Sequence, residues 1–186
     1  MSTREESRTG PARHRDADAP EEILWEGSYL AAKKRGRWEY VSRTGGIGAA
    51  VILAVDGDHI LLVEQYRVPL GRRCLELPAG LVGDERDGET AEDSARRELV
   101  EETGYRAATM TEIGRFHSSP GMTSESFLLL RAEQLEKVGE GGGTGDERIL
   151  VHRVKLAEAA KFIEEKRAEG VALDVKLLML LAREWL

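Results

Sequence analysis

Cysteine is nearly absent from this sequence, which contains only Cys74. One cysteine excludes an internal disulfide framework and fits a protein of the reducing cytosol. No apolar run approaches the length of a membrane span, and the N-terminus lacks the apolar core of a signal peptide. We therefore expect a soluble, cytoplasmic protein without a membrane partner.

Basic residues are also too scattered for a nucleic-acid-binding surface. The formal net charge is -7 at pH 7, and no basic stripe is present, so we expect no nucleic-acid partner. The chain has 186 residues, of which 41% are hydrophobic and 33% are charged. This composition suits one globular domain with a small appendage.

The appendage is expected at the N-terminus. Residues 1–20 have almost no large apolar side chain, which predicts a disordered tail. Residues 21–45 have strand-like patterns around a turn at 34–37, which predicts a β-hairpin. A lone hairpin is marginally stable in water, so this one needs a surface to pack against. Residues 46–186 would form the main domain.

The main domain mixes strand and helix patterns. Strands are expected over residues 46–55, 59–66, 72–77, 107–117, 125–132 and 148–154, and helices over 90–103, 156–168 and 173–185. The last helix is expected to bury Val175, Leu178, Leu181 and Ala182. Residues 139–147, GEGGGTGDE, read as a flexible loop. These elements predict an α+β fold, an α/β/α sandwich with a mixed sheet.

The helix between Thr90 and Gly104 carries the most informative cluster. Glu98, Glu101 and Glu102 are spaced to share one helix face, where their charges repel. A shared cation would relieve that repulsion, and carboxylate oxygens suit Mg²⁺ or Mn²⁺. Arg97 lies one turn before Glu101 and can orient its carboxylate. The alternative is a solvated helix with a run of charges.

The surrounding string favours the metal hypothesis. Arg97-Glu98-Leu99-x-Glu101-Glu102-x-Gly104-Tyr105, preceded by Glu89 and Gly83, resembles the Nudix box. The resemblance implies the Nudix fold and hydrolysis of a diphosphate linked to another group. It assigns metal binding to Glu98, Glu102 and the carbonyl oxygen of Ala79, with Glu101 joining them directly or through water. In relatives with the string ELPAG the box begins at its glycine, here Gly80, so this chain has a short insertion within residues 80–89.

Flanking strings resemble the ADP-ribose pyrophosphatase branch of this family. They are Glu64-Gln65-Tyr66-Arg67-x-Pro69, Glu76-Leu77-Pro78-Ala79-Gly80 and Pro120 in SSPGMTSE. The branch implies a homodimer that exchanges its N-terminal hairpin. By position it implies substrate contacts from Tyr29, Trp38, Glu39, Arg43, Arg67 and Pro120. The alternatives are hairpin packing for Tyr29 and Trp38 and a surface arginine for Arg67.

A general base is still required, and the resemblance places it on the loop 139–147. Glu147 is the first candidate, with Glu140 and Asp146 as substitutes, and the alternative is a solvated loop acid. A mobile loop could close over bound substrate. His117 and Ser119 suit either a ribose pocket or an ordinary turn.

Three functions follow from the resemblance. The first is Mg²⁺-dependent hydrolysis of ADP-ribose to AMP and ribose 5-phosphate. The second keeps the chemistry but uses another nucleoside diphosphate sugar, such as GDP-mannose, or a dinucleotide. The third is a sensor that binds ADP-ribose without cleaving it, which the intact carboxylates disfavour.

Overall fold

The computed structural model describes residues 13–82 and 90–181. They form two compact units, an N-terminal unit of Met1–Gly46 with Ser119–Glu125 and a main unit of Ile47–Ser118 with Ser126–Leu186. Among the described residues, no helix is long and apolar enough to cross a membrane.

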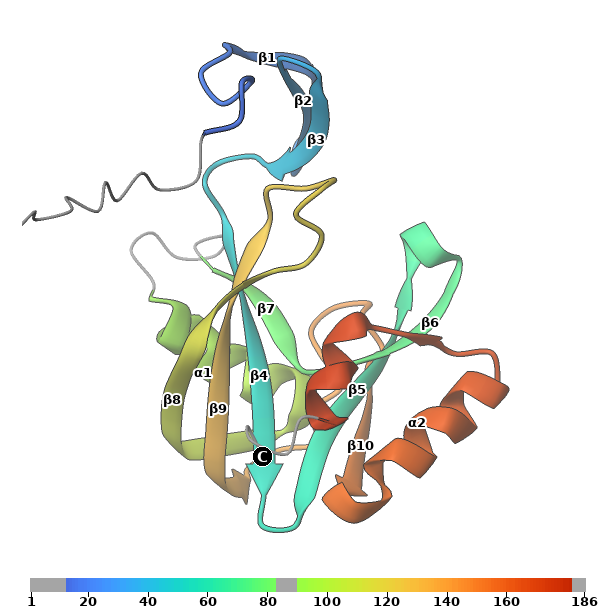
Figure 1. Cartoon of the computed structure of the whole chain (residues 1–186). Coiled ribbons are helices and arrows are strands. Elements are labelled where there is room, and N and C mark those ends of the chain that lie inside the picture. Colours follow the sequence, from blue (N-terminus) through green and yellow to red (C-terminus); the bar gives the residue numbers. More distant parts are fainter. Residues whose placement is uncertain (1–12, 83–89, 182–186) are drawn as a thin grey trace, which may run out of the picture. The chain divides into compact units, whose positions relative to one another are not determined.

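The N-terminal unit contains an antiparallel sheet of three strands (Figure 1), β1 (Glu21–Glu26), β2 (Leu30–Arg35) and β3 (Trp38–Arg43). The predicted turn is present, and Gly36 at its tip has a φ of 58°. The predicted hairpin is formed by β2 and β3, and β1 adds a third strand because the chain reverses a second time between β1 and β2. The N–H of Gly27 closes that turn by donating to the carbonyl of Leu30 at 2.8 Å.

Two further segments belong to this unit. Residues 13–20, predicted as part of a disordered tail, contain turns, and the Arg37 guanidinium donates to the Asp16 carboxylate at 3.2 Å. Residues 1–12 of the predicted tail lie outside the described residues. The segment Ser119–Glu125 lies alongside β3. There the N–H of Val41 donates to the Met122 carbonyl, and the carbonyl of Val41 accepts the Ser124 N–H, both at 3.0 Å.

The described part of the main unit is built on one mixed sheet. Its strands are β4 (Gly48–Asp56), β5 (His59–Arg67), β6 (Arg72–Glu76), β7 (Ala79–Val82), β8 (Tyr105–His117), β9 (Ser126–Lys137), β10 (Leu150–Lys155) and β11 (Ala172–Leu173). The main path runs β11-β6-β5-β4-β9-β8, with β10 paired to β5 and β7 paired to β4. The β4–β9 and β11–β6 pairs are parallel and the others antiparallel, as a mixed sheet requires.

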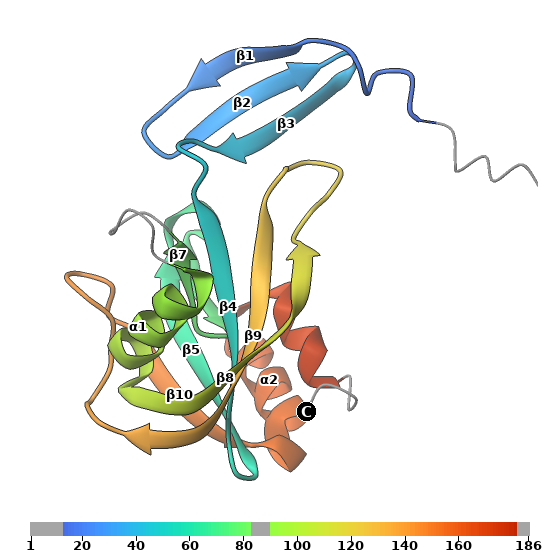
Figure 2. The ribbon, with the colours of Figure 1, turned by 90° about the vertical axis from the view of Figure 1, so that its left-hand side faces the viewer.

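Helices cover both faces of this sheet (Figure 2), which gives the predicted α/β/α sandwich. On one face, α1 (Ala91–Thr103) packs Ala95 and Leu99 onto Ile52 and Leu61. On the other face, α2 (Ala159–Ala168) follows the short helix η2 (Leu156–Glu158) and packs Phe162 onto a second apolar cluster. Because successive side chains of a strand alternate between faces, β4, β5 and β9 contribute to both clusters.

The ends of α1 match the sequence prediction. Thr90 caps the helix by accepting the N–H of Asp93 at 3.1 Å. Gly104 ends it in the left-handed conformation, with φ 76°, and donates to the Val100 carbonyl. Residues 79–82, which lie outside the predicted strands and helices, form the strand β7. Residues 83–89, with most of the predicted insertion, Gly83 and Glu89, lie outside the described residues.

The predicted helix over 173–185 is wrong. Residues Ala172–Leu173 form β11 and Val175–Leu181 form the 3-10 helix η3. A 3-10 helix has three residues per turn, so the buried positions are Leu177 and Leu180, whereas Val175 and Leu178 are exposed. The rest of the predicted segment, 182–186, lies outside the described residues.

Candidate active site

Two glutamates of α1 are buried close together against the sheet. The side chains of Glu98 and Glu102 are 17% and about 4% exposed. Burial raises the pKa of Glu98 to about 7, against the opposing charge of Arg97. Burial raises the pKa of Glu102 to about 8, and the charge of Glu98 adds to this shift. The helix therefore presents two carboxyl groups whose shared negative charge is costly without a cation.

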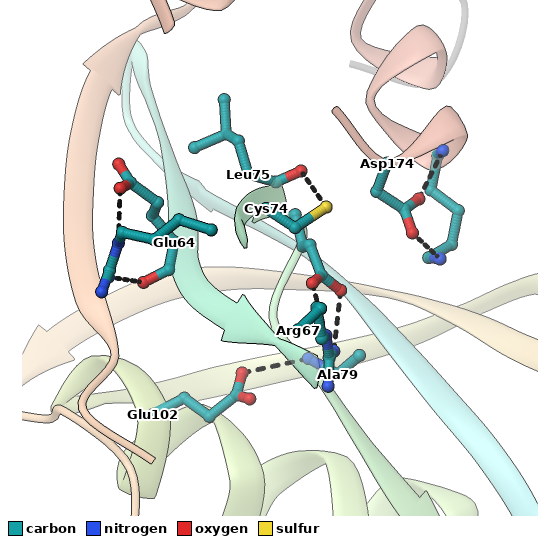
Figure 3. Close-up of polar contacts among 10 residues, drawn as sticks. Glu64, Arg67, Cys74, Leu75, Ala79, Glu102 and Asp174 are labelled. Atoms are coloured by element: carbon teal, nitrogen blue, oxygen red, sulfur yellow. Dashed lines mark hydrogen bonds and ion pairs between the residues drawn. The ribbon is translucent and has the colours of Figure 1, made fainter. Parts of the chain in front are cut away.

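Strand β7 supports both carboxylates. The N–H of Ala79 donates to Glu102 at 3.1 Å (Figure 3). Gly80 lies against the Glu98 side chain so closely that a Cβ at this position would overlap it. The glycine is therefore required for close approach, and it leaves a space that the Glu98 carboxylate fills.

Arg97 orients the outer side of this cluster. Its Nη1 donates to Glu98 and to Glu101, each at 3.1 Å, so the predicted contact with Glu101 is present. Glu101 is the most exposed carboxylate of the three, with 31% of its side chain accessible. It can therefore turn toward a ligand at lower cost than the other two.

An ion pair between the partly exposed Arg67 and the buried Glu76 was not predicted. Arg67, at the end of β5, donates from Nε and Nη2 to both oxygens of Glu76 on β6, at 2.6 and 2.8 Å. Figure 3 shows Arg67 beside Ala79 and Glu102, and the Arg67 charge opposes the raised pKa of Glu102. The signal was available, because Glu76 lies in the string ELPAG and faces the same side of the hairpin as Arg67.

The glutamates of α1 suit a divalent cation that takes only some of its ligands from the protein. In the described residues, no three His, Cys, Asp or Glu side chains are arranged to hold a metal ion. Two buried carboxylates suit Mg²⁺, which keeps several waters and takes only one or two carboxylates together with substrate phosphates. The donors available are oxygens of Glu98, Glu102 and Glu101, with the Ala79 backbone beside them.

The three loop acids proposed as base differ in their surroundings. The negative charge of Glu147 contributes to the raised pKa values of both Glu98 and Glu102. Glu140 is 95% exposed and lies 3.8 Å from Lys137. Asp146 is exposed. Glu147 is therefore the loop acid with an electrostatic connection to the helix carboxylates.

Most of the predicted substrate residues lie in the N-terminal unit. Trp38 and Pro120 line one open pocket of about 400 Å³, together with His14, Asp16, Arg35 and Tyr40. These four residues were not predicted as substrate contacts. His14 and Asp16 precede β1, where the sequence gave no strand or helix pattern, and Arg35 and Tyr40 lie in β2 and β3. Tyr29 is 71% exposed and Glu39 is exposed.

The remaining predicted substrate residues have separate partners. Arg43 pairs with Glu125 at 2.6 Å. Arg67 belongs to the main unit, as does His117 on β8. Ser119 starts an ordinary turn, because its carbonyl accepts the N–H groups of Met122 and Thr123 at 2.9 Å.

Glu64, in the same string as Arg67, is buried and makes contacts that hold parts of the fold together. Its side chain is 4% exposed and accepts hydrogen bonds from Arg73 at 2.7 Å and His152 at 2.9 Å, while Lys166 of α2 lies at 3.3 Å. Burial alone would raise its pKa, but the hydrogen bonds from these partners and the charge of Lys166 hold the pKa below its ordinary value. Glu64 thus connects β5 with β6, β10 and α2.

Comparisons with known proteins agree with this geometry. The family model described as the NUDIX domain matches residues 45–173. The chain is 37% identical over 134 residues to an ADP-ribose pyrophosphatase of Bacillus subtilis, covering 72% of this chain and 70% of that protein. It is 35% identical over 146 residues to a GDP-mannose pyrophosphatase of Cronobacter sakazakii, covering 73% and 72%.

A solved structure shares the fold. The crystal structure of an ADP compounds hydrolase superposes with a TM-score of 0.68 and 24% sequence identity, covering 89% of this chain and 91% of that one. The fold and the matched domain define an enzyme class, the Nudix hydrolases, which generally use divalent metal cations. This chain belongs to the Nudix hydrolase family.

Proposed function

We propose that this enzyme hydrolyses ADP-ribose to AMP and ribose 5-phosphate with Mg²⁺, or Mn²⁺, as cofactor. The observation that carries the proposal is the buried pair Glu98 and Glu102 on α1, in a chain whose relatives include an ADP-ribose pyrophosphatase. A bound divalent cation would neutralise diphosphate oxygens and make the phosphorus accessible to water.

The protein's own residues would hold and orient the reacting groups. Glu98 and Glu102 supply fixed oxygen ligands, with the carbonyl of Ala79 as the proposed third, and Arg97 aligns Glu101 at the rim. Glu147 is the proposed base that takes the proton of the attacking water.

Arg67 is the proposed diphosphate ligand of the main unit. Its Nε and Nη2 are held by Glu76, so the guanidinium plane is fixed and Nη1 can donate to a phosphate oxygen. A guanidinium that is already oriented loses less entropy when substrate binds.

The nucleoside would be recognised by the N-terminal unit. The pocket lined by Trp38 and Pro120 offers an aromatic surface for a planar base, and Arg35 and Asp16 offer polar groups at its wall. Tyr29, Glu39 and Arg43 stay proposed substrate contacts. An aromatic surface accepts several bases, so the site also supports a guanine nucleotide, which is the second candidate function given the GDP-mannose pyrophosphatase relative.

We also propose a homodimer that exchanges the N-terminal sheet. The sheet leaves large apolar side chains exposed on both faces of β1, namely Ile23, Leu24 and Trp25 at 57%, 55% and 60%. Tyr29 and Leu30 add to this surface. Exposed apolar groups in a small three-stranded sheet favour burial against a second copy.

A substrate panel tests the function. Purified protein is incubated with ADP-ribose, GDP-mannose or NADH, with and without Mg²⁺, and the products are separated by anion-exchange chromatography. We expect AMP and ribose 5-phosphate from ADP-ribose only when Mg²⁺ is present. Faster cleavage of GDP-mannose would select the second candidate, and binding of ADP-ribose without any product would select a sensor.

A further inference from the structure

The loop 138–149 between β9 and β10 is fastened to the end of α1. The last turn of a helix leaves carbonyls without partners inside the helix. Here the loop supplies the missing hydrogen-bond donors. The N–H of Gly142 donates to the Glu102 carbonyl at 2.8 Å, and the N–H of Gly143 donates to the Glu101 carbonyl at 3.0 Å. The sequence predicts a free, flexible segment at this place, whereas the structure has it hydrogen-bonded to the helix.

The same attachment continues at the start of the loop. The Gly104 carbonyl, just after α1, accepts N–H groups from Val138 at 2.8 Å and Gly139 at 3.0 Å. Residues 138–139 and 142–143 of the loop are thus both hydrogen-bonded to the C-terminal end of the helix.

Glycine is required for this contact. Gly141 has a φ of 69°, and a Cβ there would lie 2.7 Å from the Glu102 carbonyl oxygen and would overlap the carbonyl carbon of Thr103. A Cβ at Gly104 would likewise overlap the backbone of Gly139. All the atoms that these Cβ atoms would meet belong to the backbone, which cannot move aside as the end of a flexible side chain can.

The fastened loop also holds Glu147. The N–H of Thr144 donates to the Glu147 carboxylate at 2.7 Å, and a Cβ at Gly143 would overlap that carboxylate. Beyond it, Ile149 is 5% exposed and donates its N–H to the Gly142 carbonyl at 2.9 Å. Glu147 therefore lies between a hydrogen-bonded turn and a buried anchor.

From these contacts we propose that Gly141, Gly142 and Gly143 are positioning residues for hydrolysis. They dock the loop on the last turn of α1, so that the proposed base Glu147 is placed relative to Glu101 and Glu102 before substrate binds. The inference rests on the proposed function for the role of Glu147. The sequence suggested a mobile loop that closes over bound substrate, whereas the proposed loop is already in place. The conformational entropy of ordering the loop is then not lost during the reaction.

Two glycine substitutions separate docking from backbone strain. Gly141→Ala places a methyl group against α1. Gly145→Ala is the matched control, because Gly145 has a similar φ of 59° but no other part of the chain lies within 4 Å of where its Cβ would be. Both variants carry the penalty of an alanine in the left-handed region, and only one disturbs the contact with the helix.

The first measurement is steady-state hydrolysis of ADP-ribose with Mg²⁺. We expect Gly141→Ala to lower kcat by about tenfold to a hundredfold, the scale of a displacement of about 1 Å in a catalytic group. KM should change little, since the proposed substrate ligands lie on other elements. Gly145→Ala should keep most of the wild-type kcat. Equal losses in both variants, or wild-type turnover in Gly141→Ala, would overturn the proposal.

The second measurement needs neither variant nor substrate. Amide exchange in the wild-type protein, followed by NMR, should show protection at Gly142 and Gly143 comparable to the last turn of α1. Rapid exchange at both amides would overturn docking even in an active enzyme. Protected amides in a protein that does not hydrolyse ADP-ribose would leave docking supported and reject the proposed function instead.

Discussion

At the scale of single residues, Glu102 and Glu98 are in a different state from ordinary helical glutamates. Their pKa values of about 8 and about 7 mean that the metal-free protein holds protons where a cation is proposed to bind. A cation must displace those protons, so metal affinity should increase with pH.

This gives a prediction for stability. Because burial raises both pKa values above the ordinary 4.5, the folded protein binds more protons than the unfolded chain between about pH 4.5 and 8. These groups therefore contribute stability at low pH that is lost as the pH rises through this window. In the presence of a chelator, this contribution should lower the thermal midpoint from pH 6 to pH 8, and Mg²⁺ should raise the midpoint more at pH 8.

The control for that experiment is Glu102→Gln, which cannot ionise. Its thermal midpoint should depend less on pH than that of the wild type over the same range. An equal pH dependence in the two proteins would show that other groups cause it.

The base assignment is a second prediction for single residues. Glu147→Gln should lower turnover by about a hundredfold, the usual scale for losing a general base. Glu140→Gln and Asp146→Asn are matched controls in the same loop, and both should stay within about threefold of the wild type. A crippled Glu140→Gln beside an active Glu147→Gln would move the base to the other end of the loop.

At the scale of elements, local patterns predicted α1 with both caps and most strands, since capping residues and apolar periodicity act over a few positions. The helix over 173–185 failed because a 3-10 helix and an amphipathic α-helix have similar apolar spacing over two turns. The docking of residues 139–143 on α1 was not predictable from its glycines, which suit a flexible linker equally well.

The contact between β7 and α1 gives a further prediction. Gly80→Ala should push Glu98 aside, because the added methyl group overlaps its side chain. Gly48→Ala is the control on the paired strand β4, where the nearest contact is Val82 at 3.7 Å. The Mg²⁺ concentration for half-maximal activity should rise by about tenfold or more in Gly80→Ala. An unchanged Mg²⁺ requirement would argue against Glu98 as a ligand.

At the scale of the whole molecule, the exposed apolar side chains of β1 predict self-association. Trp25→Asp should convert the proposed dimer to a monomer, because a buried unpaired charge is costly at an interface. Sedimentation velocity would measure the change, with a chain beginning at Arg13 as the control that should stay dimeric. A wild-type protein that sediments as a monomer at micromolar concentration would contradict the dimer.

For the whole enzyme, we expect Mg²⁺-dependent hydrolysis of ADP-ribose to depend on the buried carboxylates of α1. The most direct measurement is the rate of AMP release by Glu102→Gln with saturating Mg²⁺, beside Glu92→Gln, which changes an exposed glutamate of the same helix. We expect a loss of about a hundredfold to a thousandfold in Glu102→Gln, and wild-type rates in Glu92→Gln. Release of AMP at the wild-type rate by a folded Glu102→Gln would contradict it.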